Sequence, residues 1–212
     1  MRYEARIRSL NAIILFTALC AGVWAQQGRD ALELYRAGSY DAAAEVCKRE
    51  IAERADNLEA HVVLCWSLLK LSRYSDAAVY AAEAARLSRY DVRVIEILGE
   101  IEYFQGRNKT AMQYFQEYVN LAAEGQRIDM VYYFMGEIYI RLGQFRHADI
   151  AISTALHYVG VNALWWSRLA YTREMLGDNM EAIRAYSRAL ELNPNLSDAR
   201  RGLERVRAAI DR

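Results

Sequence analysis

Proline is almost absent from this chain of 212 residues, which contains one, Pro194. Proline breaks helices, so little in the sequence interrupts them. Alanine, leucine, arginine and glutamate, which favour helices, are abundant. No stretch alternates apolar and polar residues with the period of two that indicates a half-buried strand. These absences predict an all-α protein.

An excess of charge of one sign is also lacking, because 27 basic residues balance 27 acidic ones. Without residues 1–25 the chain keeps 24 basic and 26 acidic residues, a net charge of −2. Nucleic-acid phosphates are bound largely through an excess of lysine and arginine. We therefore expect no nucleic-acid partner.

Residue types that commonly bind metals or carry catalysis are few. The three histidines, His61, His147 and His157, are scattered, whereas a metal site needs three or four converging ligands. His61 takes the place that Trp166 holds in a later repeat, which indicates a packing role. The sequence contains no nucleophile elbow, phosphate-binding glycine loop or zinc-protease pair. We expect no enzyme activity, metal or cofactor.

Cysteine is scarce too, with Cys20 near the N-terminus and Cys47 and Cys65 further on. A disulfide between Cys47 and Cys65 is conceivable in an oxidising compartment. Alternatively, both are buried thiols at positions that require small side chains. Spacing alone does not place two Cβ atoms within bonding reach, which favours the second interpretation.

The N-terminus has the composition of a bacterial export signal. Arg2, Arg6 and Arg8 precede an uncharged run over residues 9–28 with an apolar centre over 10–23. Three outcomes stay open: cleavage after Ala25, lipidation of Cys20, or retention as an uncleaved anchor. Each predicts export, to the periplasm or to a membrane-anchored position in the envelope.

Small residues recur at regular intervals along the rest of the chain. The intervals between them are 34, 34, 37 and 34 residues, a period typical of helical solenoids. The small residues are Gly38, Ser72, Gly106, Gly143 and Gly177, followed five residues later by Ala43, Ala77, Ala111, Ala148 and Ala182. The spacing therefore predicts that each unit consists of a helix, a tight turn and a second helix.

The last unit contains Trp166, Leu169, Ala170, Gly177, Ala182, Tyr186, Ala189 and Pro194 in order, and it resembles the tetratricopeptide repeat. The unit before it matches with Tyr132, Met135, Gly136, Tyr139, Gly143, Ala148, Ile152 and Ala155. The resemblance covers residues 24–195 and implies a right-handed α-solenoid of about five repeats within 26–212. The expected repeats are 24–57, 58–91, 92–125, 129–162 and 163–196, with a longer loop over 124–128.

We expect a capping helix over 197–212, because stacked repeats leave an apolar face open at the end of the array. Its apolar face carries Ala199, Leu203, Val206 and Ile210. The helices expected before it are 28–37, 40–54, 57–71, 74–87, 91–105, 108–124, 129–142, 145–158, 163–176 and 179–192.

The resemblance implies a concave groove, lined by the first helix of each unit, that receives a peptide or helix from a partner protein. The register of the repeat places Val62, Trp66, Arg93, Glu96, Glu100, Tyr103, Met130, Tyr133, Glu137, Ile140, Ser167, Tyr171 and Glu174 there. We expect Trp66, Glu96, Glu100, Tyr103, Tyr133, Glu137 and Tyr171 to bind the partner. The residues of members that grip acidic chaperone tails, lysines, an arginine and asparagines, are absent from these places.

Two acids of this predicted groove, Glu96 and Glu100, lie one helical turn apart and repel each other. A basic partner would relieve the repulsion, or Arg93 does so already, and the sequence leaves both open. We therefore expect a non-catalytic scaffold of the cell envelope that holds a protein or peptide in an aromatic and acidic groove. The alternative is a ligand-binding accessory of an envelope transporter. The sequence identifies neither the partner nor the oligomeric state.

Overall fold

The computed structural model describes residues 30–210. The predicted export signal and Cys20 lie outside the described residues. Within them the regular structure is entirely helical, which confirms the all-α prediction. The helices are α2 (Ala31–Arg36), α3 (Tyr40–Glu53), α4 (Leu58–Lys70), α5 (Tyr74–Leu87), α6 (Val92–Phe104), α7 (Asn108–Leu121), α8 (Ile128–Arg141), α9 (Phe145–Tyr158), α10 (Ala163–Leu176), α11 (Asn179–Leu192) and α12 (Ser197–Ile210).

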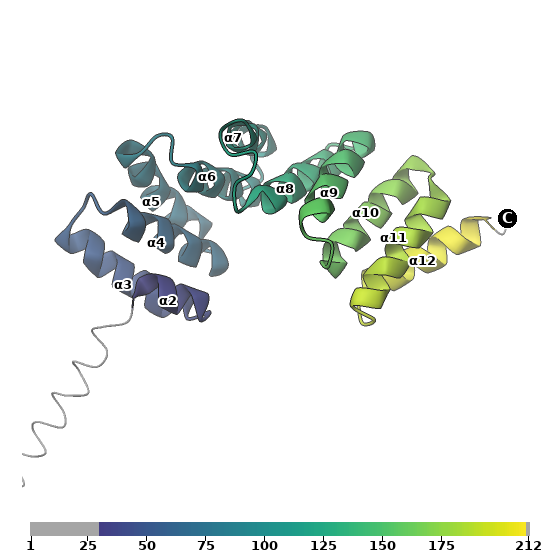
Figure 1. Ribbon diagram of the computed structural model, residues 1–212, viewed down its shortest axis with the longest axis horizontal. Coiled ribbons are helices and arrows are strands. Elements are labelled where there is room, and N and C mark those ends of the chain that lie inside the picture. Colours follow the sequence, from purple (N-terminus) through teal and green to yellow (C-terminus); the bar gives the residue numbers. More distant parts are fainter. Residues whose placement is uncertain (1–29, 211–212) are drawn as a thin grey trace, which may run out of the picture.

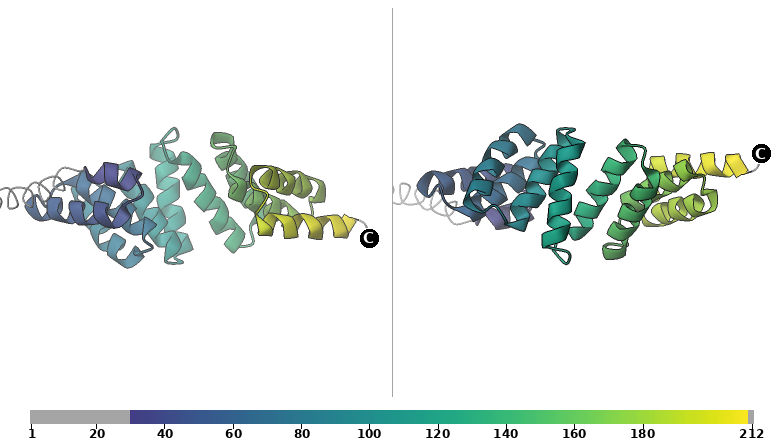
Figure 2. Two further views of the ribbon diagram at one scale, coloured as in Figure 1. Left: turned by 90° about the horizontal axis from the view of Figure 1, so that it is seen from below. Right: turned by 90° about the horizontal axis from the view of Figure 1, so that it is seen from above.

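The helices form a solenoid of five pairs and a terminal helix. Figure 1 shows the pairs following one another along the long axis in a bent row, with α2 and α12 at opposite ends. Each helix packs against the next in the chain, and first helices also meet, α2 with α4, α4 with α6 and α6 with α8. The views in Figure 2 show the same elongated array from two further sides. We call the face formed by α2, α4, α6, α8 and α10 the groove face.

The turns within the units have the backbone that the repeating small residues predict. Gly38, Gly106, Gly143 and Gly177 have φ values between 68° and 79°, and Ser72 has φ 58°. This left-handed conformation ends a helix at little cost only for glycine. In the third unit the N–H of Arg107 then bonds to the carbonyl of Glu102 at 2.9 Å and closes the turn.

Two predicted boundaries are off by three residues, and the others within the described residues differ by one residue at most. Helix α2 begins at Ala31 rather than at residue 28, because Asp30 is its N-cap, with φ −55° and ψ 131°. Helix α7 ends at Leu121 rather than at residue 124, because Ala122 leaves helical geometry, with φ −143° and ψ 58°. The N–H of Gly125 then donates to the carbonyl of Ala122 at 2.8 Å. The resulting loop is the predicted longer connection, and it places Arg127 immediately before α8.

The two helices of a unit approach closely where a small residue faces a large one. A Cβ atom on Gly99 would lie 2.5 Å from the Phe115 ring, and one on Gly136 would lie 2.4 Å from Ile152. Cys65 occupies the place of Gly99 in its own unit, and Ala81 occupies the place of Phe115. The small cysteine is thus part of the packing scheme of the repeat.

Cys47 and Cys65 are both buried free thiols. The Cys65 Sγ donates to the Ala77 carbonyl at 3.6 Å. Burial raises the pKa of each thiol to about 12. This agrees with the interpretation that both cysteines fill places for small side chains.

Helix α12 covers the end of the array as predicted. Ala199 and Val206 are buried, and Leu203 packs beside them against Tyr186 and its neighbours. Ile210, the last residue of the predicted apolar face, is 46% exposed and lines a shallow pocket with Met180 at the start of α11. Of the helices in residues 30–210, none is long and apolar enough to cross a membrane.

Candidate partner-binding groove

Two adjoining pockets lie on the groove face. The larger, of about 500 Å³, is lined by Trp66, Tyr90, Asp91, Val92, Arg93, Glu96, Tyr118, Gly125, Gln126 and Arg127. The smaller, of about 260 Å³, is lined by Tyr35, Trp66, Leu69, Lys70, Ser72, Tyr74, Glu100, Phe104, Arg127, Met130 and Phe134. Trp66 and Arg127 line both pockets, so these two side chains form the wall between them.

Aromatic contacts fix the walls of the pockets. Trp66 packs on Tyr35 with ring centroids 5.8 Å apart. Tyr74 stacks on Phe104 at 4.7 Å, with the rings nearly parallel. The Trp66 indole nitrogen is buried and has no hydrogen-bond partner within the described residues. Aromatic side chains of this kind often anchor protein partners.

Arg127 holds both acids of the wall. Its Nε and Nη2 donate to Glu96 Oε1 at 3.0 and 2.7 Å, and Nη2 also donates to Glu100 Oε1 at 2.5 Å. Glu96 is 1% exposed and Glu100 is 7% exposed. The arginine reaches them from the longer loop, where its own N–H donates to the Tyr118 hydroxyl at 3.3 Å.

The structure corrects the role expected of Arg93. Its guanidinium donates to Asp91 at 2.7 Å and to Glu59 at 2.8 Å, and it forms no bond to Glu96. Asp91 lies two residues before Arg93 and accepts from its backbone N–H as well, at 2.9 Å, which directs the arginine away from Glu96. Arg127 offsets part of the repulsion between Glu96 and Glu100 instead.

The pKa of Glu100 is raised well above its usual value. Burial is the largest cause, followed by the negative charge of Glu96, while Arg127 opposes both. One arginine thus offsets the charge of two buried acids only in part.

Acids paired with arginines recur along the groove face. Arg168 on α10 binds Glu137 on α8 through bonds of 2.6 and 2.9 Å. Arg205 on α12 binds Glu174 on α10 through two bonds of 2.9 Å. In each case the arginine follows the acid by 31 residues, as Arg127 follows Glu96. This spacing was the available sequence signal, and the sequence analysis missed it.

The pairing corrects the expected acidic groove. Glu137 is 9% exposed, and like Glu96 and Glu100 it faces an arginine rather than open solvent. Buried carboxylates require such partners because desolvation of an unpaired charge is costly. The carboxylates therefore do not present a free negative surface, and their contact with a partner stays a prediction.

The predicted tyrosines differ in how accessible they are. Tyr103 is 7% exposed, packs on Phe134 at 4.8 Å, and lies 3.9 Å under the Arg141 guanidinium. Its burial contradicts the expected role as an open groove residue. Tyr133 is half-buried and stacks on Trp165 at 4.9 Å.

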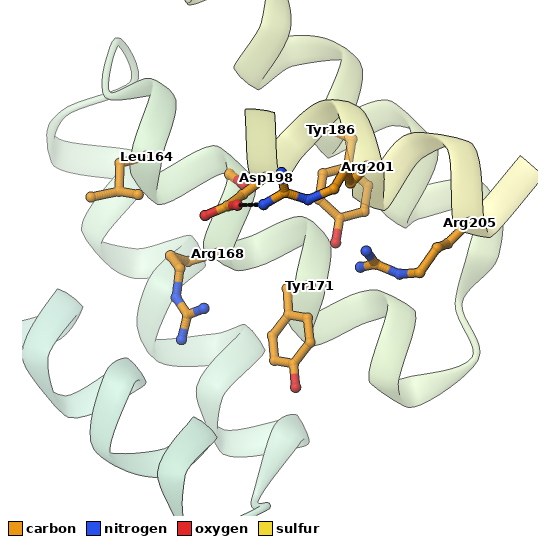
Figure 3. A pocket seen from close by; sticks show the side chains of 8 residues that line it. Leu164, Arg168, Tyr171, Tyr186, Asp198, Arg201 and Arg205 are labelled. Carbon is orange, nitrogen blue, oxygen red and sulfur yellow. Dashed lines mark hydrogen bonds and ion pairs between the residues drawn. The ribbon is translucent and has the colours of Figure 1, made fainter. Parts of the chain in front are cut away.

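Tyr171 is half-buried and lines a separate third pocket, of about 230 Å³, between α10 and α12. Figure 3 shows Arg168, Arg201 and Arg205 around this pocket. Each of these arginines already binds an acid, and Arg201 binds Asp198. The third pocket is thus not an open cluster of positive charge.

The structure therefore brings together only part of the predicted set. Trp66, Glu96 and Glu100 meet at one wall, whereas Tyr171 lies in the third pocket. Sequence reasoning missed Arg127, which comes from a loop that the repeat register does not cover. It also missed Tyr35, Tyr74, Tyr90, Phe104, Tyr118 and Phe134, which line the two adjoining pockets.

A solenoid of five helix pairs with a terminal helix defines a helical-repeat protein. Family models described as tetratricopeptide repeat match residues 28–92, 63–126 and 163–196. The chain belongs to the tetratricopeptide repeat family. No curated relative matches the sequence.

Solved structures share the fold at low sequence identity. A chain of the APC/C hetero-tetramer Cut9-Hcn1 matches with a TM-score of 0.76 and 19% identity over 83% of this chain. This chain spans only 35% of that protein. YrrB, a tetratricopeptide repeat protein with an unusual peptide-binding site, matches at 0.66 and 16%, over 79% of this chain and 85% of YrrB. TTC0263 from Thermus thermophilus matches at 0.62 and 22%, over 83% and 94% of the two chains. Such likeness shows the fold alone.

Proposed function

We propose that this protein is a non-catalytic scaffold of the cell envelope that holds a segment of a partner protein on its groove face. The observation that carries the proposal is the pair of adjoining pockets with aromatic walls around Trp66. Aromatic walls and a volume of about 500 Å³ suit a bulky apolar side chain from a partner.

The fold supports this kind of binding. The smaller pocket is lined by residues of α2, α4, α6 and α8, so a bound segment touches four successive units at once. A solenoid exposes such an extended surface because each repeat contacts only its neighbours. YrrB, a protein of the same fold, has a peptide-binding site, which supports the proposal by analogy.

The experiment uses residues 26–212, which we call the mature chain because cleavage after Ala25 would leave them, as bait against solubilised envelope proteins. Trp66→Ala should weaken capture of the partner by about 1–3 kcal/mol, because it removes an aromatic anchor. Tyr158→Ala is the matched control, since Tyr158 is an exposed aromatic residue on a second helix, α9. Capture that is unchanged in Trp66→Ala, with circular dichroism confirming the fold, would contradict the proposed groove.

The envelope location rests on residues 1–28 and is tested separately. Fractionation should recover the protein outside the cytosol, because the basic and apolar segments indicate export. The intact mass then shows whether the chain begins at Gln26, carries lipid on Cys20 or keeps its N-terminus. Full-length protein in the cytosol would overturn this part of the proposal and leave the groove untouched.

A second function is favoured by the volume of the larger pocket, which also lies within the range of small-molecule sites. In that case the protein carries a ligand for an envelope transporter. Native mass spectrometry of the purified chain distinguishes the two, since a ligand carrier retains a small molecule that Trp66→Ala releases, whereas a scaffold retains a protein.

A further inference from the structure

The wall between the two adjoining pockets contains two acidic side chains and one basic side chain. Glu96 lines the larger pocket, Glu100 lines the smaller, and Arg127 lines both. Two carboxyl groups thus share one guanidinium. Glu137 with Arg168 and Glu174 with Arg205 pair one to one, and Arg93, which is also shared by two acids, binds one that is exposed, Glu59. Both acids of the wall are buried, unlike Glu59, so two buried carboxyl groups there can accept a second positive charge.

One acceptor atom of this wall is unused. Arg127 binds Glu96 only through Oε1, and Glu96 Oε2 is buried with no hydrogen-bond donor among the described residues. Neither of the other nearby cations, Arg93 and Lys70, donates a hydrogen bond to Glu96 Oε2. Arg93 is held by Asp91 and Glu59, and Lys70 forms no ion pair within residues 30–210. A buried carboxylate oxygen without a donor is costly and rare.

We propose that this wall recognises a cationic side chain, lysine or arginine, that lies beside a bulky apolar side chain on the partner segment. The apolar group fills the larger pocket against Trp66, Tyr90 and Tyr118, and the cation donates to Glu96. The inference rests on the proposed function and specifies the chemistry of the partner.

Two interactions favour such a cation. A hydrogen bond from an ammonium or guanidinium group to a carboxylate is charge-assisted and stronger than a neutral one. The faces of Trp66 and the neighbouring tyrosines attract cations through their π electrons. The hydrocarbon stem of lysine or arginine meanwhile packs on apolar surface.

Entry of the cation requires Arg127 to move. Glu96 Oε2 is enclosed, whereas Arg127 extends from the loop after α7 and is partly exposed. The incoming group therefore takes over part of the bonding of Arg127 to the acids. Because burial and the charge of Glu96 raise the pKa of Glu100, a new positive charge should lower it again. At a pH close to the raised pKa of Glu100, binding should then release a proton.

The test uses four peptide amides in which phenylalanine is followed by lysine, arginine, norleucine or glutamate. Norleucine keeps the length of the lysine stem without its charge. The mature chain is labelled with ¹⁵N, and the indole N–H signal of Trp66 is assigned from Trp66→Phe. The lysine and arginine peptides should shift this signal saturably and bind about tenfold more tightly than the norleucine peptide, the factor expected for a hydrogen bond to a charged group.

Variants test whether the acids of the wall cause the preference for lysine over norleucine. Glu96→Gln should remove the preference for lysine over norleucine, and Glu100→Gln should abolish the proton release measured by calorimetry in buffers of different ionisation enthalpy. Glu83→Gln is the control, since Glu83 forms an exposed ion pair with Arg86 on α5, and it should change neither. Circular dichroism confirms that each variant is folded.

Equal binding of the lysine and norleucine peptides, no binding of the lysine and arginine peptides, or an intact preference in folded Glu96→Gln would overturn the inference. These results are distinct from failure of the proposed function. If Trp66→Ala loses the partner while the peptides show no cation preference, the groove stands and the inference is wrong. If the lysine peptide binds but Trp66→Ala keeps the partner, the wall binds cations and the scaffold proposal is wrong.

Discussion

Single residues decide the charge of the groove face. Glu96 and Glu100 suggest an acidic surface when they are read along α6, but Arg127, which follows by 31 and 27 residues, converts them into a buried network. Helix register locates the acids, since residues one turn apart share a face. It does not locate an arginine that comes from a loop and lies next to them only after the units have stacked.

At this scale we predict how stability depends on pH. The pKa of Glu100 is raised in the folded protein by burial and by Glu96. Arg127, Tyr35 and Lys70 also face or adjoin this carboxyl group. The stabilisation that comes from its proton is present below the unfolded pKa and is lost as pH rises through the folded pKa. Glu100→Gln should therefore lessen the fall in the free energy of unfolding as pH rises, as measured by urea denaturation.

Glu174 provides a control, because its pKa is shifted in the opposite direction to that of Glu100. Burial raises its pKa, but hydrogen bonds from Arg205 and Tyr186 outweigh this, so that the net shift is downward. The stabilisation that comes from the charged form of Glu174 is present above its unfolded pKa and is lost as pH falls through its folded pKa. Glu174→Gln should thus change the acidic side of the profile. Equal profiles for the wild type and Glu100→Gln would contradict the account of the buried pair.

At the scale of helices, complementary sizes fix how the pairs pack. Gly99 faces Phe115 across α6 and α7, and Gly136 faces Ile152 across α8 and α9. Helix α12 also places a glycine opposite a large side chain, because a Cβ atom on Gly202 would lie 2.2 Å from the Tyr186 ring. A glycine at these places allows close approach of two helix axes around a large side chain.

Gly99→Ala should accordingly destabilise the protein by about 1–3 kcal/mol, the usual cost of overpacking a core. Phe115 is fully buried and stacks on Phe134 at 5.6 Å, so its ring has little freedom to move away. Urea denaturation measures the loss. Adding Phe115→Leu to Gly99→Ala should cost less than the sum of the single changes, since the smaller side chain makes room for the methyl group.

Gly160→Ala is the control for this prediction. A Cβ atom there would meet only the Leu156 carbonyl, at 3.6 Å, which is an ordinary contact. We expect a change within about 0.5 kcal/mol. If Gly99→Ala is tolerated equally well, the close approach of α6 and α7 does not depend on the glycine.

At the scale of the whole molecule, the protein is a row in which units contact only their neighbours. Inter-unit ion pairs follow the same order, from Glu59 with Arg93 to Glu174 with Arg205. Stability in such arrays is approximately a sum of repeat and interface contributions. A truncation at one end of the array should therefore lower local stability mainly at that end.

Deletion of residues 197–212 tests this. It exposes Ala185, Tyr186 and Ala189 on α11, which α12 covers in the full chain. Hydrogen exchange should accelerate in α10 and α11 and stay nearly unchanged in α4, and the melting temperature and solubility should fall. Deletion of residues 211–212 alone is the control. Uniform acceleration along the chain would contradict the picture of local coupling, and no change would show that α12 is not a cap.

The sequence by itself determined the repeat, the helices and the cap, because these depend on local patterns: apolar spacing, small residues at turns and the period of about 34 residues. Turn positions were predictable since a left-handed backbone favours glycine, and even Ser72 was located by its spacing. Trp66 was placed on the groove face because helix register fixes a face.

Only the tertiary structure decided which side chains the groove face exposes and which it buries. Whether Glu96 and Tyr103 are open or buried depends on Arg127 and Arg141, which lie 31 and 38 residues further along the chain. The boundary at Leu121 and the loop after it set the reach of Arg127. The walls of the two adjoining pockets come from four successive units, and no local pattern records contacts between units. The chemistry of the groove therefore depends on stacking geometry, which acts across repeats rather than within one.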